Sequence, residues 1–341
     1  MAQRNHGHRH FTMRVSRHEN FTKSTVPLLG IALFAALPLI SENTVAHRIP
    51  LFKKGAIRVL ILSGENNHDW RSSTPFLRKM LLNTGRIDVR VNEEPAGMTS
   101  ETLAVYDVVV LDYNGPRWGQ TAENALADFV RSGKGLVGVH GANWAFSGLV
   151  VLGDHHIPTG IMEPPWPDYK AMIGGVWSDQ DPASGHAPRH KFLVKIVDPR
   201  HPITEGLPKT FEANDELYHN MHMADGVHFL ASAYDDPKNK PELPPGNKQP
   251  SRNGPAPSSA DGAKKWPHLD QNPTGKDEPI LWTVSYGHGR TFYTTLGHDV
   301  EAMELPGFST TFVRGVEWAA TGKVKKPEME FRSWAEPAAH P

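Results

Sequence analysis

The sequence contains no cysteine among its 341 residues. Disulfide bonds, thiolate metal ligands and a cysteine nucleophile are therefore excluded. The charges are nearly balanced, with a formal net charge of -1, so the composition favours neither a nucleic-acid partner nor an acidic solvating tail. Hydrophobic residues make up 38% of the chain, which is ordinary for a globular protein with a sizeable core.

Long apolar runs are also missing, apart from one near the N-terminus. Basic residues precede an uncharged apolar run over residues 26–40, and small residues follow it up to Ala46. The run is shorter than the roughly 20 residues that a membrane span needs. We therefore predict a secretory signal peptide over residues 1–46 and an exported protein, periplasmic or extracellular. An uncleaved membrane anchor and a buried helix are the alternatives, and we expect no membrane contact beyond this segment.

Beyond residue 50 the chain alternates short apolar runs with helical patterns. The runs at 57–62, 87–91, 108–111 and 136–139 have the length and composition of buried strands. A helix is predicted after the first run, with Ser73 or Thr74 as its N-cap and Pro75 in its first turn. Another helix is predicted from Thr121 to Gly133. This alternation favours an α/β fold with an open, mostly parallel sheet and helices on both faces.

The pattern changes after residue 150. Strands are predicted at 192–197 and 227–234, a hairpin at 280–285 and 291–295, and a closing helix at 310–321. Residues 235–279 are rich in Pro, Gly, Ser and Asn, which indicates a long loop insertion. Residues 324–341 are predicted to be a C-terminal tail. Whether the protein forms a homo-oligomer is left open, because no sequence pattern favours or disfavours one.

Polar and aromatic side chains follow directly after four predicted strands. In an open parallel sheet, ligands bind beyond the carboxyl ends of the strands, so these side chains are expected at one edge. Asn, Asp and His can bind sugar hydroxyls directionally, and Trp offers a flat apolar face to a sugar ring. For any single histidine, an ordinary structural role is the alternative. The candidates are Asn67, His68, Asp69, Trp70, Asn114, Trp118, His140, Asn143, His298 and Asp299.

A fifth candidate segment covers residues 214–219. On an extended strand Glu216 and Tyr218 would share one face, and Asp215 and His219 would share the other. A carboxylate near an imidazole can act as a general base, orient the ring or complete a metal site. A solvated strand edge is the alternative.

Several stretches in the same order carry a family resemblance. They include SGENNHDW after the first strand, GVHGANW around the end of the fourth and TLGHD after the last. The chain resembles the ThuA-like (trehalose utilisation) family over residues 56–323. The matching stretches are 58–70, 106–115, 129–146, 186–208, 215–221, 231–236, 277–299 and 314–322.

This resemblance implies a flavodoxin-like sheet similar to that of the class I glutamine amidotransferases. That superfamily places a catalytic cysteine on a sharp turn after a strand, where this chain has His140. Cysteine-dependent amide hydrolysis is therefore excluded. His298 has a place similar to that of the superfamily's histidine. The family is associated with trehalose-like disaccharides and their 3-keto forms, which implies a small saccharide as substrate or ligand.

Residues and resemblance together lead us to predict a carbohydrate-processing enzyme. His140 and His298 are expected to act as general acid and base or as ligands of one divalent metal ion. Asp299, Glu216 and His219 are the further catalytic candidates. The predicted substrate-binding residues are Asn67, His68, Asp69, Trp70, Asn114, Trp118 and Asn143.

Two other function classes stay open. A non-catalytic sugar-binding or accessory protein of a sugar oxidation pathway would use the same Trp and Asn residues. An interaction protein would use the 235–279 loop, whose low apolar content disfavours a strong interface. No nucleotide cofactor is expected, because Ser63-Gly64-Glu65 lacks the glycines through which a strand–helix turn approaches a pyrophosphate.

Overall fold

The computed structural model describes residues 50–146, 166–178, 180–239 and 272–325, together with the backbone of 149–152 and 155–158. The predicted signal peptide, most of the predicted loop insertion and nearly all of the predicted tail lie outside these residues. Among the helices that are described, none is both long and apolar enough to cross a membrane.

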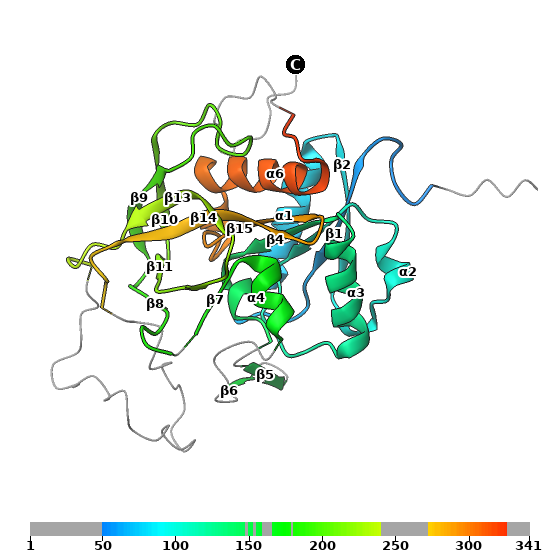
Figure 1. Ribbon diagram of the computed structural model, residues 1–341, viewed down its shortest axis with the longest axis horizontal. Helices are drawn as coiled ribbons and strands as arrows, with labels where there is room; N and C mark the ends of the chain where they lie inside the picture. Colours follow the sequence, from blue (N-terminus) through cyan, green and yellow to red (C-terminus); the bar gives the residue numbers. More distant parts are fainter. Residues whose placement is uncertain are drawn as a thin grey trace, which may run out of the picture. The chain divides into compact units, whose positions relative to one another are not determined.

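A mixed sheet organises the described part of the chain, in the order β10-β9-β13-β14-β15-β4-β3-β1-β2 (Figure 1). The strands from β15 to β2 run parallel, and β14, β13, β9 and β10 extend the sheet in antiparallel fashion. Their bounds are β1 Ile57–Leu62, β2 Ile87–Asn92, β3 Val108–Leu111, β4 Gly135–Val139, β9 His190–Ile196, β10 Thr210–Asp215, β13 His228–Tyr234, β14 Asp277–Tyr286 and β15 Gly289–Thr294.

Short strand pairs lie outside this sheet. These are β5 (Leu149–Leu152) with β6 (His155–Pro158), β7 (Gly175–Val176) with β12 (His222–Met223), and β8 (Gly185–His186) with β11 (Tyr218–His219). Two short 3-10 helices, η1 (Pro95–Gly97) and η2 (His140–Trp144), also lie outside the sheet. Of these, η2, β8 and β11 contribute side chains to the site described below.

Helices cover both faces of the sheet, because successive strand residues point to opposite sides. Val59 and Ile61 of β1 face one buried cluster, and Leu60 and Leu62 face the other. The first cluster includes α1 (Trp70–Asn83), α5 (Val300–Met303) and α6 (Pro306–Thr321); the second includes α2 (Ser100–Leu103), α3 (Gln120–Arg131) and α4 (Pro167–Ile173). Figure 1 shows α6 on one side of the strands, with α3 and α4 on the other. The predicted α/β fold class is confirmed.

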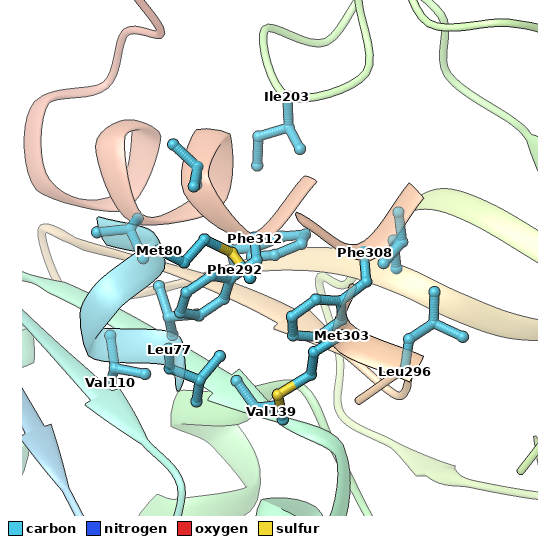
Figure 2. Packing of buried hydrophobic residues seen from close by; sticks show 14 of the residues in the cluster. Leu77, Met80, Val110, Val139, Ile203, Phe292, Leu296, Met303, Phe308 and Phe312 are labelled. Carbon is cyan, nitrogen blue, oxygen red and sulfur yellow. The ribbon is translucent and has the colours of Figure 1, made fainter. Parts of the chain in front are cut away.

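The first cluster fixes the centre of the sheet (Figure 2). Phe308 and Phe312 of α6 stack on each other with ring centroids 5.5 Å apart, and both are buried with Phe292 of β15. Burying one such aromatic side chain stabilises a fold by about 1.5–3 kcal/mol. Leu77 and Met80 of α1 close the same cluster. The packing holds β4 and β15 side by side, and both strands lead directly into the site.

Several element boundaries differ from the sequence prediction; α6, for example, begins at Pro306 instead of residue 310. Two of the differences have a clear local reason. Helix α1 begins at Trp70, so Pro75 lies inside it, because Asp69 caps the helix through the backbone N–H of Ser72. The predicted caps Ser73 and Thr74 instead bond to Asp112.

The second difference is in the predicted loop insertion, which ends earlier than expected. Strand β14 begins at Asp277 because this polar stretch pairs with the end of β13. The hairpin that follows, β14 with β15, is as predicted.

Candidate active site

The carboxyl ends of parallel strands β1, β3, β4 and β15 meet beside a cavity of about 230 Å³. Within the described part of the chain, its walls carry side chains that follow each of these strands, and the end of β4 contributes Gly141 and Trp144 of η2. Segments from β8 and from the β10–β11 connection close the other side. The lining residues are Asn67, His68, Asn114, Gly141, Trp144, Trp177, His186, Glu216, Tyr218 and His298.

His140 lies directly behind this lining and is 2% exposed. Its φ of 46° lies in the left-handed region, which costs a β-carbon-bearing residue energy and points to a constrained turn. The hydroxyl of Tyr293 donates to the His140 carbonyl at 2.6 Å. The ring is held as well, since Nδ1 donates to the Thr295 carbonyl at 2.7 Å. The Nε2 atom of His140 is therefore aimed at the site, where the Tyr218 hydroxyl lies 2.8 Å away.

Glu216 is the charged centre of the site. Its carboxylate lies 3.4 Å from Nε2 of His140, 3.5 Å from Nε2 of His298 and 3.7 Å from Nε2 of His186. Burial by itself raises the pKa of Glu216, but the hydrogen bond from His140 and the surrounding imidazoles outweigh it and hold the pKa well below its usual range. Burial lowers the pKa of His140, and here Glu216 and Asp215 overcome it, so that pKa is raised. An ionised carboxylate among imidazoles results.

His68, His140 and Glu216 could hold a metal ion. One ligand atom from each lies within 4.8 Å of the others. The Nδ1 atom of His68 donates to the Asn66 side-chain oxygen at 3.0 Å, which leaves Nε2 with its lone pair. The Nδ1 atom of His140 is likewise held by Thr295, and a bound metal would replace the Nε2 proton that His140 shares with Glu216. Such second partners typically fix the ring of a metal-binding histidine. Burial and the neighbouring histidines hold the pKa of His68 well below its ordinary value, so its ring is neutral, as a ligand must be.

His298 contacts both the cavity and an acidic partner. Its Nδ1 lies 3.3 Å from Oδ2 of Asp299, whose carboxylate also pairs with Arg189. Asp299 itself caps α5 by accepting from the backbone N–H of Ala302 at 2.9 Å. A carboxylate on one imidazole nitrogen orients the ring and leaves the other nitrogen to exchange a proton. The dyad therefore presents Nε2 of His298 to the cavity.

Two buried carboxylates hold segments of the site together, Asp215 through backbone N–H groups and Asp112 through side chains. Asp215 accepts from the backbone N–H groups of Glu216 at 2.9 Å and of Gly297 at 2.7 Å, and so ties the two loops that carry Glu216 and His298. Asp112 accepts from the hydroxyls of Ser73 and Thr74 and from the side-chain amide of Asn66.

Four side chains of the lining were not among the predicted site residues: Trp144, Trp177, His186 and Tyr218. The signal for Tyr218 is that it shares a strand face with Glu216. Trp144 ends η2, His186 lies in β8, and Trp177 follows β7. The only signal for Trp144 was its place after His140 and Asn143. Trp177 follows the two-residue strand β7, and His186 ends the two-residue strand β8. Strands this short have no hydrophobic pattern, so periodicity could not place these residues at the edge of the sheet.

Several predicted site residues lie outside the cavity lining. Asp69 serves as the α1 cap, Trp70 stacks under Arg71, and Trp118 packs on Tyr113 in the second core cluster. Each of these has its side chain committed to a local structure instead of the cavity.

Asn143 and His219 also lie away from the lining. Asn143 is fully buried, with its amide 3.8 Å from the sulfur of Met221. His219 is on the opposite face of β11 from Tyr218, where Nδ1 pairs with Asp235 at 2.8 Å. Alternation along the strand thus separates His219 from Glu216 and Tyr218, which both face the cavity.

The fold is that of a class I glutamine amidotransferase-like protein, and in this chain a histidine, His140, follows strand β4. The profile of the family described as trehalose utilisation, ThuA, matches residues 58–319, and the chain belongs to the ThuA family. The predicted resemblance is therefore confirmed.

Solved structures agree with this assignment. A ThuA-like protein from Parabacteroides merdae ATCC 43184 is 27% identical, with a TM-score of 0.56 over 80% of this chain and 92% of that one. A ThuA-like protein from Bacteroides uniformis ATCC 8492 is 21% identical, with a TM-score of 0.51 over 81% of this chain and 98% of that one. A search of the curated proteins found no match.

Proposed function

We propose that this ThuA-family protein is a carbohydrate-processing enzyme that acts on a trehalose-like disaccharide or its 3-keto derivative. The observation that carries the proposal is the carboxylate of Glu216 placed within 3.4–3.7 Å of three imidazoles at one cavity. Such a cluster supplies charge stabilisation and proton transfer together. The family's association with trehalose utilisation supports the substrate class.

A 3-keto group makes the proton on the neighbouring carbon acidic, and His298 is the group placed to remove it. Nε2 of His298 takes the proton, the C–H electron pair forms a C=C bond to the carbonyl carbon, and the C=O π pair moves onto the carbonyl oxygen to give an enolate. Return of this proton from His298 to the enolate oxygen gives the enediol isomer of the keto sugar. Alternatively, the glycosidic C–O bond breaks, and the leaving oxygen takes the proton back from His298. Asp299 holds the ring for both steps.

His68, His140 and Glu216 would hold one divalent metal ion. Two imidazole nitrogens and one carboxylate oxygen suit zinc or another first-row transition metal better than magnesium or calcium. When bound, such an ion polarises a carbonyl oxygen. Asn67 and Asn114, linked by a 2.6 Å hydrogen bond, would bind sugar hydroxyls beside it.

One experiment tests metal and turnover together. The full chain is purified with His6, His8 and His10 replaced by alanine, because these residues could bind metal adventitiously. Metal content is measured, and 3-keto-trehalose and trehalose are followed by NMR. We expect stoichiometric metal that is lost in His68→Ala and His140→Ala but kept in the control His288→Ala, whose side chain is exposed. Turnover that persists in His140→Ala would contradict the catalytic proposal.

The non-catalytic alternative uses the same cavity. A sugar-binding or accessory protein would bind the saccharide tightly, form no product and tolerate loss of His298. The convergence of histidines on Glu216 favours the enzyme, since binding hydroxyls alone needs no ionised cluster.

We also propose that the protein is exported, on the evidence of its N-terminal sequence alone. Fractionation of cells expressing the chain with a C-terminal tag tests this. The tagged protein in the cytoplasmic fraction at full mass would contradict export.

A further inference from the structure

We propose that the cavity holds a single pyranose ring against an aromatic wall formed by Trp144, Trp177 and Tyr218, leaving the rest of the saccharide outside. This inference rests on the proposed function and narrows its substrate class to terminal pyranose units. Within the described residues the three aromatic side chains, with Met221, form a buried cluster separate from the two clusters that pack the sheet.

The wall is built by segments that are fixed to one another. The backbone N–H of Trp177 donates to the Asn143 carbonyl at 3.1 Å, which joins the segment after β7 to η2 and so places Trp177 near Trp144. The two indole centroids lie 6.2 Å apart, and Trp177 meets Tyr218 edge-on at 5.1 Å. All three line the cavity. The wall is therefore held in place by contacts within the protein.

The cavity has a polar side and an apolar side. Asn67, Asn114 and Glu216 line it with polar groups, and the aromatic wall supplies apolar surface. A pyranose ring has the same division, with hydroxyls around its rim and C–H groups on its faces, and aromatic side chains offer flat apolar surface to such faces. A ring placed on the wall would turn its hydroxyls or carbonyl toward Glu216 and the histidines.

A second observation points to a bound acceptor. The indole N–H of Trp177 is buried and has no hydrogen-bond partner among the described residues. A buried donor without a partner is unfavourable. A sugar hydroxyl or ring oxygen in the cavity would accept this hydrogen bond.

The volume of the cavity limits the bound part of the ligand to one monosaccharide unit. Pockets for drug-sized ligands run from about 300 Å³ upward, whereas this cavity has about 230 Å³. We therefore expect methyl α-glucopyranoside and trehalose to bind the full chain with affinities within about fivefold of each other, a difference of about 1 kcal/mol.

Calorimetric titration with both saccharides tests the proposal. Trp177→Phe keeps a ring but removes the N–H, and should weaken both about fivefold, the value of one hydrogen bond. Trp177→Ala should weaken both by more than about tenfold. The control Trp318→Phe changes a half-buried tryptophan of α6 and should change neither.

The contrary outcomes are separate from those of the enzymatic proposal, because binding is read without turnover. Unchanged binding in Trp177→Phe and Trp177→Ala would overturn the aromatic wall. Binding that strengthens tenfold or more from the monosaccharide derivative to trehalose would overturn the single-unit cavity. Weakened binding in the variants together with no turnover in the wild type would support the wall and contradict only the enzyme.

Discussion

Replacing Glu216 by glutamine removes the charge at the centre of the site while keeping the shape of the side chain. The carboxylate is only 16% exposed. Its hydrogen bond with His140 lowers the pKa of Glu216 and raises the pKa of His140. A hydrogen bond involving a charged group contributes about 1.5–3 kcal/mol. We expect the variant to lose about 2 kcal/mol of unfolding free energy in metal-free buffer, which lowers the Tm by about 4–8 °C.

The pH dependence of this loss has a definite sign. The lowered pKa of Glu216 gives stability that is present above its ordinary pKa of 4.5 and is lost as the pH falls. The raised pKa of His140 gives stability that is present below its ordinary pKa of 6.5 and is lost as the pH rises through the folded-state value. The difference between wild type and Glu216→Gln should therefore be largest between pH 4.5 and 6.5.

Thermal unfolding followed by circular dichroism, with EDTA present and the pH varied, measures this difference. The matched control is Glu212→Gln, on β10, where an exposed glutamate pairs with Lys191 at 2.9 Å. A pH-independent loss of stability, or one no larger than that of the control, would refute the assignment of Glu216 as the charged centre.

Two further substitutions test the scaffold of the site. Gly138→Ala places a β-carbon 2.3 Å from Cε2 of Tyr293, whose hydroxyl holds the His140 carbonyl. This variant should lose about 1–3 kcal/mol of unfolding free energy, measured by urea unfolding. The control Gly97→Ala has no atom within 4 Å of its new β-carbon and should lose none. Equal losses in the two variants would contradict the packing around Gly138. Asp112→Ala removes the acceptor shared by Ser73, Thr74 and Asn66 and should cost about 2–3 kcal/mol. It should also weaken metal binding through the Asn66–His68 contact, and unchanged metal affinity in calorimetry would contradict that link.

Much of the parallel half of the fold could be predicted from the sequence, because its strands are continuous apolar runs. The residues 108–111 were assigned with the bounds that β3 has. The rule that ligands bind beyond the carboxyl ends of parallel strands then selected Asn67, His68, Asn114, His140 and His298. The structure places all of these in or directly behind the lining of one cavity.

The remaining site residues depend on contacts that no local pattern reveals. Trp177 reaches the cavity through one backbone bond to Asn143, and His186 through the two-residue strand β8. Conversely, Trp118 and Asp69 have the right chemistry and sequence position, but core packing and helix capping use their side chains. Distinguishing such cases needs the tertiary structure, since both kinds of residue follow a strand.

The most direct test of the proposed enzyme is solvent deuterium exchange into 3-keto-trehalose, followed by NMR in D₂O. It detects removal of the proton beside the carbonyl whatever the final product is. We expect exchange with the wild type, a loss of about 10²-fold or more with His298→Gln, and wild-type exchange with the control His288→Gln. Exchange that persists in His298→Gln would contradict His298 as the base. Absence of exchange with the wild type, under conditions where the sugar binds, would contradict catalysis at this site.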